Sequence, residues 1–367
     1  MMLPRACILI ACTGAPLAAQ APAHPDFVAR VDSLANAALK SLPAASIAIA
    51  VVHGSDTLLM RGYGTSDLAS KRPATANTVY EIGSLTKQFT ATAIMRLVEQ
   101  GKLALDDPIS KYVAFPLQGN QVTIRNLLTH TSGIHNYTAK PEWRTHWGDD
   151  LSPDSIVGFV ARDSFDFAPG TRMRYSNTGY MLLGMIIEKV TGRPYATVLD
   201  ETIFKPLGLT RTGYCAQHPT DPEVAKGYST KNGNFEPAAY LSMTHPFAAG
   251  AICSTASDLA RWEMLFHGGK VVSPASYALM TAPTVLSGGQ RSNYGFGLSI
   301  VNMDLDKLGS RRALAHSGGI NGFLTHQLYL PEDSLEVIVL TNTDAKGPEL
   351  LSLDVVMAAL TLVVRKP

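Results

Sequence analysis

The stretch that decides the fold reads Glu81-Ile-Gly-Ser-Leu-Thr-Lys-Gln-Phe-Thr-Ala-Thr-Ala-Ile-Met-Arg-Leu-Val-Glu-Gln-Gly101. Apolar side chains recur at Phe89, Ala93 and Leu97, and this i, i+4, i+8 spacing predicts an amphipathic helix. The closing glycine is typical of the residue that follows a helix C-terminus. We therefore expect a helix that begins near its serine and ends before Gly101.

Ser84 and Lys87 lie one turn apart at the start of this predicted helix, so their side chains project from the same face. The positive end of the helix macrodipole disfavours a cation there. That field, together with burial, would shift Lys87 toward its neutral form, which can accept a proton from Ser84. The pair is a candidate nucleophile and base. A capping serine followed by a surface lysine gives the same pattern, and Ser-x-x-Lys is expected roughly once by chance in a chain of this length.

The composition is that of an ordinary globular protein, with 46% hydrophobic and 17% charged residues and a net charge of +1. Neither nucleic acid nor an anionic membrane surface is indicated as a partner. No stretch of the sequence reaches the ~18 uninterrupted apolar residues of a membrane span. A length of 367 residues suits two packed lobes, or one large domain that carries an insertion.

The beginning of the chain resembles an export signal, because Arg5 precedes an apolar run and the small-residue run 15–20 follows it. We expect a signal peptide over residues 1–19 and an exported protein, periplasmic or secreted. The stretch Leu9-Ile-Ala-Cys12 also resembles a bacterial lipobox, which would leave Cys12 lipidated. Both readings remain open.

Beyond the leader, two cysteines remain, Cys215 and Cys253, and sequence spacing does not determine whether they pair. The run of small residues around Cys253 predicts a tightly packed interior, where a free cysteine behaves as a small hydrophobe. We expect both to be unpaired, although export would permit a disulfide.

Strand patterns occur at both ends of the chain, and helical patterns lie mainly between them. This order predicts an α/β fold of the α+β type, in which one antiparallel sheet is built from both termini, flanked by helices, with a mainly helical lobe inserted. The sheet lobe would comprise about 24–80 and 248–367, and the helical lobe about 81–247. The expected strands are 45–53, 57–62, 294–301, 312–316, 323–330 and 335–341, and the expected helices include 25–42, 122–130, 180–190, 257–266 and 349–364.

Two further motifs carry candidate functional residues. Tyr175-Ser-Asn177 follows a Pro-Gly turn and precedes a helix, and by itself it would more often be ordinary turn chemistry around a packed ring. His316-Ser317-Gly318-Gly319 ends a predicted strand, where glycines let a ligand approach the backbone closely.

The order Ser84-x-x-Lys87, Tyr175-x-Asn177, His316-Ser317-Gly318 resembles the penicillin-recognising serine hydrolases. The Tyr-x-Asn element is similar to that of the branch with class C β-lactamases, D,D-carboxypeptidases, D-aminopeptidases and esterases. The resemblance extends over nearly all of residues 20–367 and implies a single β-lactamase/transpeptidase-like catalytic domain. Supporting stretches are Leu127-Leu-Thr-His-Thr-Ser-Gly133, Phe167-Ala-Pro-Gly-Thr171, Pro206-Leu-Gly-Leu209 and Ala249-Gly-Ala-Ile-Cys-Ser-Thr-Ala-Ser-Asp258.

The resemblance implies a role for each of these residues. Ser84 would attack an amide, lactam or ester carbonyl to give an acyl-enzyme, and Lys87 and Tyr175 would handle its proton. Asn177 would hold the substrate and steady Lys87. The backbone N–H groups of Ser84 and Gly319 would form the oxyanion hole. Ser317 and Gly318 would line the substrate site, and no metal or organic cofactor is implied.

His316 departs from the family pattern, because β-lactamases of this type usually carry Lys-Thr-Gly at this position. An imidazole has an unperturbed pKa of ~6.5, so it carries less charge at neutral pH than lysine. We expect its positive form to attract a substrate carboxylate, less firmly than lysine would, which favours peptidase or esterase chemistry over β-lactam turnover. Alternatively, His316 only hydrogen-bonds Tyr175 or caps the end of the strand. His135 and Tyr137 either line the pocket or are ordinary loop residues.

The leading hypothesis is an exported serine hydrolase that acts on a small-molecule or peptide substrate, most simply a D-amino-acid peptidase or esterase. The alternative is a non-catalytic penicillin-binding sensor that is acylated without turnover. The sequence does not determine the substrate or the oligomeric state.

Overall fold

The computed structural model describes residues 24–115, 121–217 and 223–364. The expected signal peptide over residues 1–19 and the lipobox cysteine Cys12 lie outside the described residues. Within them, no helix combines the length and the apolar character needed to cross a membrane.

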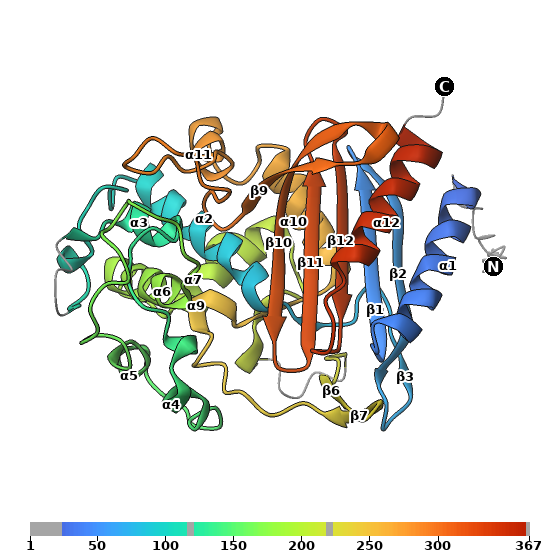
Figure 1. Ribbon diagram of the computed structural model, residues 1–367, viewed down its shortest axis with the longest axis horizontal. Helices are drawn as coiled ribbons and strands as arrows, with labels where there is room; N and C mark the ends of the chain where they lie inside the picture. Colours follow the sequence, from blue (N-terminus) through green and yellow to red (C-terminus); the bar gives the residue numbers. More distant parts are fainter. Residues whose placement is uncertain (1–23, 116–120, 218–222, 365–367) are drawn as a thin grey trace, which may run out of the picture.

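The centre of the fold is an antiparallel sheet built from both ends of the chain, as the sequence predicted (Figure 1). In the part of the chain that the structure describes, the strand order of this seven-stranded sheet is β3-β2-β1-β12-β11-β10-β9. The β1–β12 pairing joins the two ends, with Ile47 opposite Thr341 and His53 opposite Leu335. The strands are β1 (Ser46–His53), β2 (Asp56–Asp67), β3 (Arg72–Pro73), β9 (Ser299–Asp304), β10 (Ser310–Ile320), β11 (Phe323–Leu330) and β12 (Leu335–Thr341).

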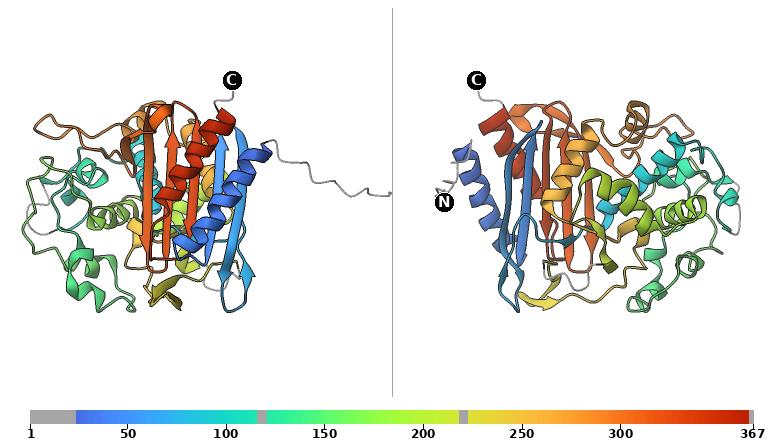
Figure 2. Two further views of the ribbon diagram at one scale, coloured as in Figure 1. Left: turned by 45° about the vertical axis from the view of Figure 1, so that its right-hand side comes forward. Right: turned by 180° about the vertical axis from the view of Figure 1, so that it is seen from behind.

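Both faces of the sheet are covered, which explains why β1 reads as a nearly continuous apolar run rather than an alternating one. Alternate residues of β1 belong to different cores: Ile47 and Ile49 pack with α1 (Pro25–Ser41) and α12 (Glu349–Ala359). Ala48 and Ala50 belong to the core on the other face, which includes side chains of α2 (Thr86–Glu99) and α10 (Ala256–His267). Figure 2 shows α1 and α12 side by side on their face of the sheet.

The segment between the sheet's two halves is mainly helical and lies beside the β10 side of the sheet (Figure 1). Its helices are α2, α3 (Ile124–Leu128), α4 (Pro141–Arg144), α5 (Pro153–Gly158), α6 (Asn177–Thr191), α7 (Tyr195–Leu199), α8 (Lys205–Leu207) and α9 (Phe247–Gly250), and α11 (Pro274–Met280) follows α10. Short strands β4 (Tyr80–Glu81), β8 (Ile252–Ser254) and β5 (Gly213–Tyr214) form a second sheet, and β6 (Tyr228–Lys231) pairs with β7 (Asn234–Pro237).

Two expected elements lose several of their predicted residues in the structure. The strand predicted over 294–301 begins only at Ser299, because the preceding residues turn at Gly297, whose φ is +76° and which packs against the backbone of Lys87. The helix predicted over 122–130 is restricted to α3. Thr123 and Asn126 form a capping box at its start, and His130 has a left-handed φ of +57°, which ends any continuation.

The expectation that Cys215 and Cys253 are unpaired is wrong. The two form a disulfide with a Cα–Cα distance of 4.9 Å. Cys253 lies on β8, where Gly213 of β5 is its cross-strand neighbour, so the sheet brings the short turn after β5 next to Cys253. Cys253 is buried, as the small residues around it predicted. The prediction failed because the fold places Cys215, 38 residues away in sequence, within bonding distance of it.

Candidate active site

Ser84 lies in a single 3₁₀ turn, η1 (Gly83–Leu85), that leads directly into α2. This turn packs tightly against β10. A Cβ atom on Gly318 would lie 2.1 Å from the Ile82 carbonyl oxygen, and one on Gly83 would lie 2.8 Å from the Gly319 nitrogen. Glycine at these positions therefore permits the close approach that places Gly319 beside Ser84.

Lys87 is fully buried one turn after Ser84. Its Nζ atom lies 3.1 Å from Ser84 Oγ and donates hydrogen bonds to Asn177 Oδ1 and to the Ala249 carbonyl oxygen, both at 2.8 Å. No carboxylate forms an ion pair with it among the described residues. Burial without a counter-charge shifts the pKa of Lys87 well below its usual value. The amine is thus held in contact with the serine in a setting that favours its neutral form.

Tyr175 and Asn177 reach the same place from the segment that starts α6. The Tyr175 ring lies over Lys87 Nζ, which is 4.8 Å from the ring centroid. The Tyr175 hydroxyl is buried and has no direct hydrogen-bond partner among the described residues. Burial raises the pKa of Tyr175, and the nearby Ser84 hydroxyl opposes this only in part. Asn177 is fixed by its backbone N–H, which donates to Asn136 Oδ1 at 3.1 Å.

His316 is buried in an aromatic cluster behind Tyr175. Its Nε2 atom lies 2.9 Å from the Tyr294 hydroxyl, and its Nδ1 lies 2.6 Å from the Ser317 carbonyl oxygen. Burial is the main cause that lowers the pKa of His316 to about 3, and the nearby Lys87 amine, whenever it is protonated, acts in the same direction. The expectation of a positively charged imidazole that attracts a substrate carboxylate is therefore wrong, because both ring nitrogens are engaged and the neutral form is favoured.

His130, from the stretch that follows α3, belongs to the same cluster and was not predicted as a site residue. Its ring centroid lies 4.3 Å from that of Tyr175 and 4.6 Å from that of Tyr294. Its Nδ1 accepts a hydrogen bond from the Ser176 backbone N–H at 3.2 Å. His130 thus supports the position of the Tyr175 loop.

Ser317 does not contribute its side chain to this site. Side chains alternate along a strand, so Ser317 projects to the face opposite His316, where its hydroxyl donates to Glu349 Oε1 at 2.9 Å at the start of α12. The role of Ser317 at the substrate site stays a prediction, and in this structure only its backbone could fulfil it. Gly318 provides the close packing described above, and its role in substrate binding stays a prediction.

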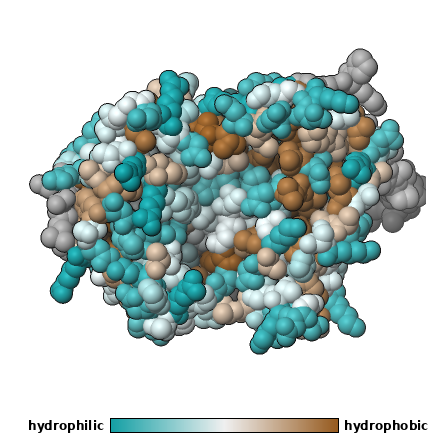
Figure 3. All heavy atoms as spheres, in the orientation of Figure 1, coloured by the Kyte–Doolittle hydropathy of each residue, from teal (hydrophilic) through white to brown (hydrophobic). Residues whose placement is uncertain are grey.

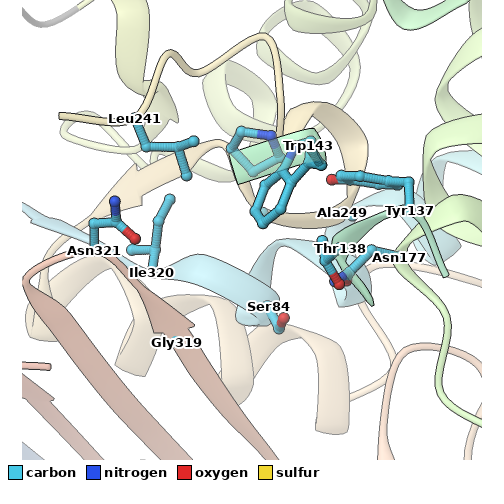
Figure 4. A pocket seen from close by; sticks show the side chains of 12 residues that line it. Ser84, Tyr137, Thr138, Trp143, Asn177, Leu241, Ala249, Gly319, Ile320 and Asn321 are labelled. Atoms are coloured by element: carbon cyan, nitrogen blue, oxygen red, sulfur yellow. The ribbon is translucent and has the colours of Figure 1, made fainter. Parts of the chain in front are cut away.

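A cavity of about 250 Å³ opens in front of Ser84 (Figure 4). Its walls come from the segments after α3, before and within α9, and at the end of β10. On the face shown in Figure 3 the surface is hollowed between the helices and the sheet. The lining residues are Ser84, Tyr137, Thr138, Trp143, Asn177, Leu241, Pro246, Ala249, Gly250, Gly319, Ile320 and Asn321, none of which carries a charge.

Sequence reasoning missed most of the apolar wall. Trp143 and Leu241 face the cavity in Figure 4 but lie in segments without a recognisable motif. Of the two loop residues left open, Tyr137 lines the cavity, whereas His135 pairs with Asp166 at 3.0 Å. Ala249 belongs to a stretch that supported the resemblance, but its carbonyl contact with Lys87 has no sequence signal.

The comparison with protein families decides the assignment, because the Beta-lactamase family model matches residues 31–361. The chain belongs to the Beta-lactamase family. The predicted resemblance to the penicillin-recognising serine hydrolases and the predicted fold class are both confirmed.

Individual relatives agree with this assignment. The chain is 30% identical over 313 residues to penicillin-binding protein 4* of Bacillus subtilis, a match that covers 81% of this chain and 68% of the relative. It is 27% identical over 342 residues to a D-aminopeptidase of Gluconobacter oxydans, covering 91% and 62%. This member of the Beta-lactamase family therefore spans about two thirds of the length of these relatives.

Among solved structures, D-amino acid amidase from Ochrobactrum anthropi, complexed with L-phenylalanine amide, superimposes with a TM-score of 0.79 at 25% identity. The match covers 91% of this chain and 99% of the amidase. The family and the names of these relatives support the predicted enzyme class, a serine hydrolase.

Proposed function

We propose that this protein hydrolyses a small ester or amide through an acyl-Ser84 intermediate. The observation that carries the proposal is the environment of Lys87, whose fully buried amine contacts Ser84 Oγ without a carboxylate partner among the described residues. A lysine with a purely structural role would more often keep its charge by pairing or by reaching solvent. A neutral amine can accept the Ser84 proton as the oxygen attacks the carbonyl carbon.

The remaining steps use the neighbouring groups. Because burial raises the pKa of Tyr175, its phenol stays protonated and can donate its proton to the leaving group, to be replenished from Lys87. The N–H groups of Ser84 and Gly319 would stabilise the oxyanion, and Gly319 lines the cavity beside Ser84. Water then attacks the acyl-Ser84 ester, with Lys87 or Tyr175 taking its proton, and releases the acid.

The substrate we propose is uncharged near the scissile bond. The described lining of the cavity contains no Lys, Arg, Asp or Glu, and His316 is neutral at physiological pH. A substrate carboxylate or ammonium would lose its hydration here without gaining a partner. Two relatives are named for D-amino acid substrates, so esters and amides of D-amino acids whose amino group is blocked and uncharged are the first class to test.

We also propose that the protein is exported. The Cys215–Cys253 disulfide supports this proposal, because disulfides persist in oxidising compartments. The leader pattern in the sequence points in the same direction. The division into a sheet lobe (24–80 and 248–367) and a helical lobe (81–247) remains a proposal as well, and the cavity includes residues from both ranges.

A single experiment distinguishes a serine hydrolase from a sensor that is acylated without turnover. The protein is mixed with a p-nitrophenyl ester in a stopped-flow instrument, and the burst is compared with the steady rate. An enzyme turns over many equivalents after the burst, whereas a sensor releases one and stops. Peptide mapping after fluorophosphonate treatment must place the label on Ser84. A label on another serine, or full activity in Ser84→Ala, would contradict the proposal.

A further inference from the structure

A second group of titratable side chains lies outside the Ser84 cavity, between α10 and the sheet. Glu263 and His267 are separated by four residues on α10, so they project from the same face. Glu336 of β12 lies opposite them. It occupies the same face of the strand as Ile338 and Leu340, which pack in the core that includes α10.

These three side chains converge. One potential ligand atom of each residue lies within 4.8 Å of the other two. The His267 Nε2 atom is 3.0 Å from Glu263 Oε2, and His267 Nδ1 is 2.9 Å from the Tyr277 hydroxyl. The His267 ring also stacks on Tyr329, with centroids 3.7 Å apart. The Tyr277 contact engages Nδ1 and leaves Nε2 facing Glu263, and a hydrogen bond to the other ring nitrogen is how a second residue usually orients a metal-binding histidine.

The polar atoms of this cluster are buried and unsatisfied. Glu263 is 1% exposed and Glu336 is 3% exposed. Apart from the 3.0 Å contact between Glu263 Oε2 and His267 Nε2, the four carboxylate oxygens and His267 Nε2 have no hydrogen-bond partner within the described part of the chain. They line a cavity of about 240 Å³ that shares no residue with the Ser84 cavity. Exposed residues Gly54 and Ser334 also line it, which gives a path from the surface.

Two neighbouring buried carboxylates need compensation. No Lys or Arg forms an ion pair with either glutamate among the described residues. Buried charges in proteins are normally paired or coordinate a metal. One divalent cation would balance both carboxylates while the imidazole remains neutral. Two oxygen ligands and one nitrogen ligand, with a fourth position open to the cavity, match the open tetrahedral sites of Zn²⁺.

We propose that Glu263, His267 and Glu336 form a binding site for one divalent transition-metal ion, most simply Zn²⁺, that joins α10 to β12. The site shares no residue with the Ser84 cavity, so the ion would stabilise the packing of the helix on the sheet and take no part in the hydrolysis.

The test starts with the full chain after dialysis against a chelator. Isothermal titration with Zn²⁺ alone should show one saturable site per chain, and the melting temperature should rise on binding, because a ligand that prefers the folded state stabilises it. Glu336→Gln keeps the shape of the side chain and removes one charge, so it should weaken this binding at least tenfold. His146→Ala removes an exposed His–Asp pair and serves as the matched control, since it should leave the site unchanged.

A second measurement needs no variant. X-ray absorption at the zinc edge of the wild-type protein should show a first shell of oxygen ligands and one imidazole. The proposal is overturned if wild-type protein shows no one-to-one binding, if Glu336→Gln binds equally well, or if the spectrum shows sulfur or several imidazoles. A wild-type protein that ignores Zn²⁺ while Glu336→Gln is equally or more stable would instead indicate carboxylates that share a proton.

Discussion

Lys87 Nζ and Ser84 Oγ lie 3.1 Å apart, and the amine has no carboxylate partner within the described chain. The pair depends on two further acceptors, Asn177 Oδ1 and the Ala249 carbonyl oxygen, which hold the amine in place without adding a full charge. Neutral acceptors position the lysine but leave its pKa low, whereas a carboxylate would raise it. The following predictions test this arrangement and the contacts around it.

Lys87→Arg should lower kcat/KM for a neutral ester at least tenfold, which is about 1.4 kcal/mol in the barrier. The guanidinium keeps the positive charge but cannot give up its proton at working pH, so it cannot serve as a base. Steady-state kinetics measures the loss, and near-UV circular dichroism verifies the fold. Retention of more than a tenth of the wild-type value would show that Lys87 is not the base.

Asn177→Asp should move the acidic limb of the kcat/KM profile to higher pH. The new carboxylate would lie within hydrogen-bond distance of Lys87 Nζ and raise its pKa, so that a higher pH is needed to obtain the neutral amine. Asn177→Ser is the control, because its shorter side chain withdraws the contact with Lys87 Nζ without adding a charge. If both variants lose activity and the acidic limb of the kcat/KM profile stays at the same pH, the titration of Lys87 does not determine the pH dependence.

Replacing both cysteines with alanine should lower the free energy of unfolding by about 4 kcal/mol, the loop-entropy value for cysteines separated by 38 residues. Urea unfolding without a reductant measures the difference. Dithiothreitol should destabilise the wild-type protein toward the value of the double variant and leave the variant itself unchanged. Equal stability of the two proteins without reductant would contradict the disulfide.

His316 should make the wild-type protein less stable as the pH falls. Its pKa is about 3 in the folded state and ~6.5 in the unfolded state. Between these values the unfolded chain binds a proton that the folded chain does not, so stability is lost on acidification. Between pH 7 and pH 5 this amounts to about 2 kcal/mol. Urea unfolding of His316→Gln at both pH values should show a loss smaller by that amount. An equal loss in both proteins would mean that His316 is protonated in the fold.

Leu241→Ala should raise KM for esters with small acyl groups by about 10-fold and change kcat less, because it removes apolar contact area from the wall of the cavity. KM for esters with bulkier acyl groups should rise less, since these groups can fill the space that the substitution opens. Tyr240→Ala provides the control, because this neighbouring side chain is 72% exposed and does not line the Ser84 cavity. If Tyr240→Ala raises KM by the same factor, the effect comes from a disturbance of the segment around residues 240 and 241, and Leu241 makes no specific contact with the substrate.

The sequence by itself determined the features that depend on local geometry. The spacing of Ser84 and Lys87 places them on one face of any helix that contains them. Apolar runs predicted β11 and β12 within their observed bounds, because a strand buried on both faces needs no information from distant residues to be recognised. The order of the three motifs was sufficient for the family, and the family implied the fold.

Only the tertiary structure decided which distant groups meet. The disulfide follows from the pairing of β5 with β8, and the neutral state of His316 follows from its burial against Tyr294. The cluster of Glu263, His267 and Glu336 requires a helix and a strand to pack face to face. Such contacts depend on how whole elements fit together, and a side chain's charge depends on the solvent and partners that this packing leaves to it.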